Sequence, residues 1–209
     1  MANQIGIDLG TSLSVISCFR DNGTVEVVYK YHEERLLPSF VHFDKTTGSL
    51  KTHVGTEAKE ALDYDDENVV FQAKSKIGTD ADLGTPNSGP KSPVEISAII
   101  LEQLLKTAEE KLGEKIETAT ITVPANWLDN KKNATKEAGL KAGLKNVYII
   151  NEPTSAALFY SLQEKKDGKV VVYDIGGGTF DITVIEIIGQ NINVIANEGA
   201  KIGGTDFDW

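Results

Sequence analysis

Two stretches of the chain place an aspartate shortly before a glycine turn. They read IDLGT at residues 7–11 and YDIGGGT at residues 173–179. Glycines let backbone N–H groups approach an anion closely and form a concave nest, and a hydroxyl such as that of Thr11 or Thr179 adds a further donor. We therefore expect the two turns to bind phosphate groups.

The aspartates of these stretches, Asp8 and Asp174, would repel a bare phosphate. They become useful when a magnesium ion that keeps most of its waters lies between the carboxylates and the phosphates. A single DLGT segment is more often an ordinary hairpin turn. Three consecutive glycines, 176–178, would only weaken a simple connection, because they raise the entropy of the unfolded chain. The sequence contains neither the P-loop pattern nor the dinucleotide-binding GxGxxG pattern, so the paired turns remain as the phosphate-binding device.

The elements that must position the first turn read as strands. Apolar residues alternate over 5–9 and recur from Leu13 to Phe19, which predicts a strand, a tight turn and a second strand, with a further strand at 24–29. Residues from about 39 to 92 are rich in turn formers and contain only short apolar segments, so we interpret them as a small inserted subdomain.

A long helix is predicted after this insert. Ser92 can cap its N-terminus, Pro93 suits the first helical position and Glu95 completes a capping box. Gly113 can end the helix in a left-handed conformation. We expect this helix to cover the core.

The remaining pattern alternates between strands and helices. It predicts a strand over 119–123, a helix that Asp129 caps and that runs to Gly143, a strand over 147–150 and a helix that begins at Pro153. This order is typical of an α/β fold, whose ligand site usually lies beyond the carboxyl ends of the strands.

Composition excludes several classes of function. The 209 residues carry 21 Lys and Arg against 31 Asp and Glu, a net charge of -10, so we expect no nucleic-acid partner and no membrane partner. Cys18 is the sole cysteine and is interpreted as a buried small hydrophobe. His32, His42 and His53 are scattered at no recognisable metal-ligand spacing. The absence of a signal-peptide pattern predicts a cytoplasmic protein.

Four stretches, in this order and spacing, resemble the signatures of the heat-shock protein 70 family of chaperones. They are IGIDLGTS at 5–12, ITVPA at 121–125, NEPTSAA at 151–157 and DIGGGTFD at 174–181, and GGTDFD at 203–208 is similar to that family's next glycine motif. The resemblance covers nearly the whole chain. It implies an actin-like ATPase (ribonuclease H-like) fold, with two lobes around a nucleotide cleft that binds ATP or ADP and Mg2+.

The resemblance also implies roles for individual residues. Asp8 and Asp174 match the magnesium-site aspartates. The phosphate-binding positions are Gly10, Thr11, Ser12, Gly176, Gly177, Gly178, Thr179, Gly203 and Gly204. The catalytic positions are Lys74, Glu152, Asp181 and Thr179, and whether Glu152 or Asp181 removes a proton is left open.

The family pattern divides the chain into lobe I, residues 1–168 with the insert at about 39–92, and the opening strands of a truncated lobe II, residues 169–209. The segments that clasp adenosine and bind peptides would then be missing, so we expect an impaired ATPase. In the full-length protein the implied partners are unfolded polypeptides, a J-domain co-chaperone and a nucleotide exchange factor. We also expect the lobe II strands to pair with a second copy in a homodimer, with fraying in a monomer as the alternative.

Some positions depart from the family pattern. The insert after Gly78 is short, Tyr148 stands where many members have an arginine, Asn126 and Trp127 replace a usual aromatic pair, and Lys201 and Thr205 are uncommon. Two other classes share the fold and remain open: a sugar or acetate kinase, and an actin-like filament protein. Sugar phosphorylation would indicate the first, and nucleotide-dependent sedimentation the second.

Overall fold

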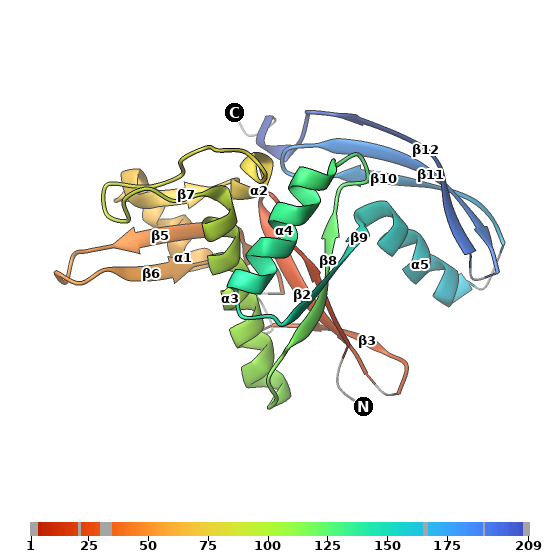
Figure 1. Cartoon of the computed structure of the whole chain (residues 1–209), viewed down its shortest axis with the longest axis horizontal. Coiled ribbons are helices and arrows are strands. Elements are labelled where there is room, and N and C mark those ends of the chain that lie inside the picture. The colour runs from red at the N-terminus through yellow and green to blue at the C-terminus, as the bar shows by residue number, and fades with distance from the viewer. Residues whose placement is uncertain (1–3, 21, 30–34, 165–166, 190, 207–209) are drawn as a thin grey trace.

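The computed structural model describes residues 4–20, 22–29, 35–164, 167–189 and 191–206. They form three β-sheets and the helices that pack on them (Figure 1). The central sheet has the strand order β3-β2-β1-β8-β9, and the short strand β4 pairs with β2. Its strands are β1 (Gln4–Asp8), β2 (Leu13–Phe19), β3 (Val25–Val28), β4 (Leu37–Pro38), β8 (Thr118–Val123) and β9 (Asn146–Asn151).

The central sheet is mixed, which confirms the α/β class. Strand β1 runs antiparallel to β2 and parallel to β8, and β8 runs parallel to β9. The carboxyl ends of β1, β8 and β9 therefore lie at one edge of the sheet, together with the turn that joins β1 to β2. The strands predicted over 5–9, 13–19, 24–29, 119–123 and 147–150 are confirmed to within two residues at each end.

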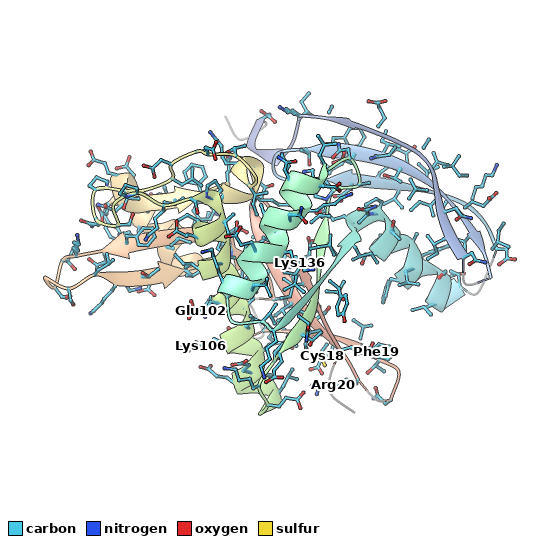
Figure 2. All side chains as sticks on the ribbon, viewed as in Figure 1. Cys18, Phe19, Arg20, Glu102, Lys106 and Lys136 are labelled. Carbon is cyan, nitrogen blue, oxygen red and sulfur yellow. The ribbon has the colours of Figure 1, made fainter. Side chains whose placement is uncertain are left out.

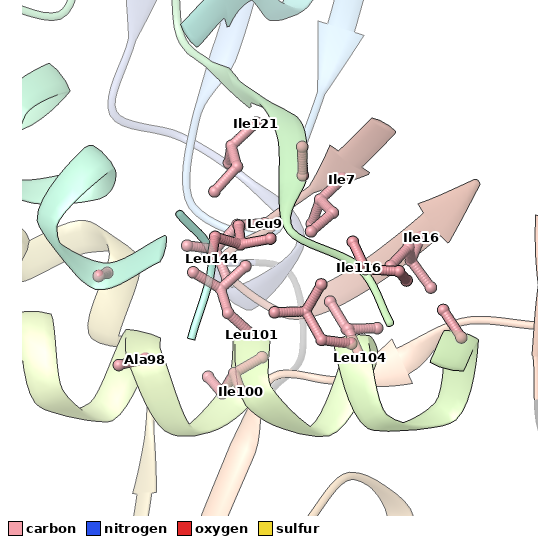
Figure 3. Close-up of a cluster of buried hydrophobic side chains, with 14 of the residues drawn as sticks. Ile7, Leu9, Ile16, Ala98, Ile100, Leu101, Leu104, Ile116, Ile121 and Leu144 are labelled. Carbon is pink, nitrogen blue, oxygen red and sulfur yellow. The ribbon is translucent and has the colours of Figure 1, made fainter. Parts of the chain in front are cut away.

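Helices α3 (Pro93–Leu112) and α4 (Asp129–Lys141) pack together beside the central sheet. Figure 3 shows the core between α3 and the sheet, where Leu101 and Leu104 lie beneath Ile7, Ile16 and Ile121. Because all five side chains are buried, this core holds the strands that carry the first turn.

The ends of these helices test the capping predictions. The capping box is confirmed, since the Glu95 amide donates to Ser92 Oγ at 3.2 Å and the Ser92 amide donates to Glu95 Oε2 at 2.9 Å. Gly113 is left-handed, with φ of 72°. The prediction that Asp129 caps α4 was wrong: Leu128 takes the extended cap position and Asp129 is already helical. The Asp129 carboxylate lies in the first turn, where its negative charge interacts favourably with the positive end of the helix dipole.

A second, three-stranded sheet, β6-β5-β7, is formed within residues 40–71 and lies at the left of Figure 1. Its strands are β5 (Phe40–Asp44), β6 (Lys51–Val54) and β7 (Val69–Phe71), and its short helices are α1 (Thr56–Glu60), η1 (Ala61–Asp63), η2 (Asp66–Asn68) and α2 (Ala73–Lys76). His42 and His53 are cross-strand partners whose rings stack at 5.8 Å, so two histidines that are separate in sequence are neighbours in space. Among the described residues, no group of three or more His, Cys, Asp or Glu side chains is suited to hold a metal ion.

The third sheet follows helix α5 (Glu152–Glu164), which begins one residue before the predicted start. Strands β10 (Gly168–Ile175), β11 (Phe180–Ile188) and β12 (Asn191–Ala200) are antiparallel, and η3 (Gly204–Asp206) comes after them. Ala157, Ile185 and Ile187 form a small buried core between α5 and the sheet. On β10, Tyr173 and Ile175 are 66% and 70% exposed.

Cys18 lies near the end of β2, beside Phe19 and Arg20 (Figure 2), and is completely buried, as predicted. Within the described part of the chain, no helix is both long enough and apolar enough to cross a membrane.

Candidate functional site

The first glycine turn, which joins β1 to β2, is held from behind by two buried serines. Ser14 Oγ accepts a hydrogen bond from the Gly10 amide at 3.1 Å, and Ser39 Oγ donates to the Gly10 carbonyl oxygen at 2.9 Å. The two hydroxyl oxygens lie 2.9 Å apart, and the Ser39 amide donates to the Ser12 carbonyl oxygen at 2.8 Å. Since both serines are buried, this network fixes the main chain of the turn without help from solvent.

The second glycine turn, which joins β10 to β11, is held mainly by main-chain contacts. The Gly176 amide donates to the Thr179 carbonyl oxygen at 2.9 Å, and the Gly204 amide donates to the Gly176 carbonyl oxygen at 3.0 Å. A side chain at Gly203 would overlap with the main chain of Gly177 and Gly178. The structure thus brings together the two downstream glycine segments that the sequence indicates.

The two turns meet directly. A methyl group on Gly177 would overlap with the Ser12 side chain, and one on Gly178 would lie 3.6 Å from Thr11 Cγ2. The glycine-rich main chain of one turn therefore faces the hydroxyl-bearing residues of the other, although about 165 residues separate them in the sequence.

Carboxylates line the space beside these turns. Asp8 lies at the end of β1 and accepts a hydrogen bond from Thr122 Oγ1 at 2.7 Å. Burial raises the pKa of Asp174 on β10, and the negative charge of Asp8 adds to this rise. Burial also raises the pKa of Glu152 at the start of α5, with further contributions from Asp8 and Asp174. These carboxylates repel one another, and a cation between Asp8 and Asp174 would relieve that repulsion.

Lys74 brings one positive charge into this group. Its Nζ donates to Glu152 Oε1 at 2.6 Å, and its side chain is only 10% exposed. The charge of Lys74 opposes the rise in pKa of Glu152, Asp174 and Asp181. Just before it, Gln72 has a left-handed φ of 57°, unlike the other non-glycine residues that the structure describes. This strained residue occupies the N-cap position of α2.

Asp181 completes the group from β11. It is 7% exposed, and burial raises its pKa while a hydrogen bond from the Thr179 side chain and the charge of Lys74 lower it. Asn126 Nδ2 donates to Asp181 Oδ1 at 3.3 Å. The carboxylates continue into a groove of about 610 Å3, which is lined by Asp8, Glu152 and Asp174 and by apolar side chains of α5.

Comparison with known proteins shows the family of the chain. The family model described as Hsp70 protein matches residues 4–88 and 86–209. The chain belongs to the Hsp70 family. It is 45% identical over 214 residues to the chaperone protein DnaK of Thermosipho africanus, covering 100% of this chain and 35% of that relative. It is 46% identical over 206 residues to the DnaK proteins of Thermotoga neapolitana and Thermotoga maritima, covering 98% of this chain and 34% of each.

This Hsp70 chain therefore spans about a third of the length of the curated relatives it matches. Some residues that shape its site could not be recognised from sequence. Ser14 looks like an ordinary strand residue and Ser39 like the first residue of the insert. Thr122 lies in the ITVPA stretch without any sign that it binds Asp8. Tyr148, one of the departures from the family pattern, is 62% exposed on β9.

Proposed function

We propose that this Hsp70 chain binds the phosphates of MgATP and MgADP between its two glycine turns, as part of the ATP-hydrolysing domain of a chaperone. The observation that carries this proposal is the contact between the turns beside Asp8, Asp174, Glu152 and Lys74. Each turn alone is ordinary. Together they offer main-chain N–H donors on two sides of one space, which suits a chain of phosphates.

We infer that Asp8 and Asp174 hold Mg2+ through its water molecules. The mutual repulsion of the two carboxylates supports this assignment, because a hydrated divalent cation is the partner that would stabilise both in their charged forms. The metal would neutralise charge on the phosphate oxygens. Thr122 keeps the Asp8 carboxylate oriented through its 2.7 Å hydrogen bond.

Lys74 is assigned to the transferred phosphoryl group, where its ammonium would offset charge on the oxygens and orient the attacking water. Glu152 and Asp181 are assigned to accept hydrogen bonds from that water. Both have a pKa raised by burial, and both lie within the influence of Lys74. Thr179 would orient Asp181 and add a donor to the phosphate cradle.

We further infer the actin-like, ribonuclease H-like fold, with residues 1–168 as lobe I, the insert at about 39–92, and residues 169–209 as the opening strands of lobe II. The mixed central sheet, the projecting small sheet and the second glycine hairpin support this division. The relatives are named as chaperones. For this chain we propose unfolded polypeptides, a J-domain co-chaperone and a nucleotide exchange factor as partners of the whole protein, in the cytoplasm.

Calorimetric titration of the 209-residue chain with MgATP and MgADP tests the binding site. The double variant Asp8→Asn, Asp174→Asn should bind about 10- to 100-fold more weakly, as expected for loss of residues that act on a metal through its waters. Lys136→Ala, which changes an exposed lysine of α4 (Figure 2), is the matched control. Absence of nucleotide binding by the unchanged chain at millimolar concentration would contradict the proposal.

Hydrolysis is tested in a chimaera in which this chain replaces the matching third of Thermotoga maritima DnaK. Lys74→Ala should leave the affinity for MgATP largely intact and remove nearly all turnover, because it deletes charge stabilisation and spares the glycine cradle. Undiminished hydrolysis would overturn the role of Lys74. Phosphorylation of a sugar by the chimaera would instead indicate a kinase.

A further inference from the structure

The loop between β8 and α4 places two neighbouring side chains, Asn126 and Trp127, against different candidate catalytic groups. The Trp127 amide donates to the Pro124 carbonyl oxygen at 3.2 Å, and the Lys131 amide donates to the Leu128 carbonyl oxygen at 3.1 Å. The first bond closes a turn over 124–127, and the second belongs to the start of α4, where Leu128 is extended. Main-chain hydrogen bonds therefore hold the loop at both ends.

Trp127 contacts the amine of Lys74. The Lys74 Nζ lies 5.7 Å from the centroid of the indole ring, within the range of a cation–π contact. The same Nζ donates to Glu152 Oε1 at 2.6 Å. The amine of this long, flexible side chain is thus held by a carboxylate and an aromatic face together.

The indole ring is itself fixed to α4. Lys131 Nζ lies 5.0 Å from the ring centroid. Asn130 Nδ2 donates to the Gly78 carbonyl oxygen at 3.1 Å, and a methyl group on Gly78 would come within 3.1 Å of Lys131 Cα. The start of α4 therefore contacts the segment around α2 at two points, once at Lys74 through Trp127 and once just after α2 at Gly78.

Asn126 contacts the other group. Its Nδ2 donates to Asp181 Oδ1 at 3.3 Å. Gly199 is the cross-strand partner of Asp181, and a methyl group there would overlap with Asp181 Oδ1 and come within 3.2 Å of Asn126 Nδ2. Gly199 has no positive φ, so its main-chain conformation does not require glycine. Its lack of a side chain instead leaves room for the bond between Asn126 and Asp181.

We propose that Asn126 and Trp127 are positioning residues, with Trp127 setting the place of the Lys74 amine and Asn126 setting the place of the Asp181 carboxylate. One short loop then fixes the separation of two groups that come from helix α2 and strand β11. The relevance to hydrolysis rests on the proposed function, whereas the positions of Lys74 and Asp181 can be tested without nucleotide.

The first experiment measures how well the Lys74 amine is held in the nucleotide-free chain. Its rate of acetylation is followed by peptide mass spectrometry and divided by that of the exposed Lys136. Trp127→Leu should raise the relative rate about three- to tenfold, as expected for loss of one cation–π contact. Trp127→Phe, which keeps an aromatic face, should stay within about twofold of the unchanged chain. Leu128→Ala, at a side chain 75% exposed in the same loop, is the control.

An unchanged Lys74 rate in folded Trp127→Leu overturns the assignment of Trp127. If that variant does not fold, chain labelled with 6-fluorotryptophan takes its place, because fluorine weakens the negative face of the ring and preserves its shape. A Lys74 acetylation rate that does not rise on fluorination would then overturn the assignment of Trp127. For Asn126, Asn126→Ala should speed amide hydrogen exchange over 180–182, and equal exchange would overturn its role.

The second experiment separates positioning from binding in the DnaK chimaera. Asn126→Ala and Trp127→Leu should each lower kcat about 10-fold, because small misplacements of reacting groups are costly, and should leave KM within about twofold. Trp127→Phe should restore most of kcat. A rise in KM with unchanged kcat would overturn positioning. If the unchanged chimaera hydrolyses no ATP, the proposed function fails, and the acetylation and exchange results still decide the positions of Lys74 and Asp181.

Discussion

The two glycine turns share a sequence motif but are supported in different ways. Behind the first, Ser14 and Ser39 form a buried hydrogen-bond network on a sheet with an extensive core. Behind the second, the buried core consists of Ala157, Ile185 and Ile187, and β10 exposes large apolar side chains on its other side.

This difference means that the pair of turns has one firm half, on the central sheet, and one weakly supported half, on the β10–β12 sheet. Local unfolding free energy follows the amount of buried apolar contact, so segments around a small core open more readily than those around a large one. We therefore expect the first turn to keep its shape while the second adapts. Substitutions in each half test this contrast.

Core truncation should separate the two halves most clearly. Ile121 and Ile185 are both completely buried, and Ile→Ala at such sites costs about 2–5 kcal/mol of unfolding free energy. Ile121→Ala should destabilise the central sheet and everything attached to it. Ile185→Ala should release the amides of β10, β11 and β12 and leave those of β1 and β8 protected, as measured by hydrogen exchange. Loss of protection everywhere in Ile185→Ala would mean that both halves unfold as one unit.

The contact between the turns is tested by a pair of glycine substitutions. Gly177→Ala overlaps with Ser12 and should cost about 1–3 kcal/mol, since overpacked sites must shift their main chain. Gly178→Ala has only ordinary contact with Thr11 and is the matched control. Chemical denaturation should measure the loss of unfolding free energy, and hydrogen-exchange mapping should show faster exchange in the second turn alone. Equal stability of the two variants would mean that the turns do not touch in solution.

The serine network is tested by Ser39→Ala. The change leaves the Gly10 carbonyl oxygen and the Ser14 hydroxyl short of a buried partner, so we expect a loss of about 1 kcal/mol or slightly more. Ser49→Ala, at an exposed serine, should change stability by less than about 0.5 kcal/mol. A denaturation midpoint for Ser39→Ala equal to that of the control would show that the first turn does not depend on the network.

The smallest effect concerns acid. The pKa of Asp65 is lowered, first by its hydrogen bond with His42 and next by that with Asn68. A carboxyl with a lowered folded pKa stabilises the protein above its ordinary pKa of about 3.9, and this contribution is lost as pH falls through the folded value. Asp65→Asn should therefore lessen the loss of stability on acidification, measured by denaturation at a series of pH values.

The carboxyls of the site should respond in the opposite direction. Glu152 and Asp181 have raised pKa values, so their protonation favours the folded state as pH falls. Asp181→Asn, which cannot titrate, should remove part of that favourable response. If unfolding free energy depended on pH in the same way in Asp65→Asn and Asp181→Asn, the opposite responses of the two carboxyls would be contradicted.

Local features of the fold were predictable from sequence because local rules decide them. The capping box at Ser92 and the alternation over 5–9 depend on residues a few positions apart, and both are confirmed. Asp129 failed as a cap because Leu128 holds the extended cap position and Asp129 is already helical, a one-residue difference that residue type alone does not reveal.

The contacts that shape the site join distant segments and leave no local signal. Lys74 and Glu152 lie 78 positions apart, and only the family resemblance drew attention to Lys74. The bond from Ser39 to Gly10 and the contact between Trp127 and Lys74 depend on how the small sheet and α4 dock. The roles of the site residues remain predictions.

Cys18 is a built-in probe for opening of the central sheet. The thiol is completely buried on β2, and the sequence has no other cysteine. A thiol reagent can therefore modify the chain only while the central sheet is open, whereas opening of the β10–β12 sheet produces no such signal. The rate at which Cys18 is labelled in the protein without substitutions thus measures how often the firm half opens. Amide exchange over β10–β12 measures the opening of the other half.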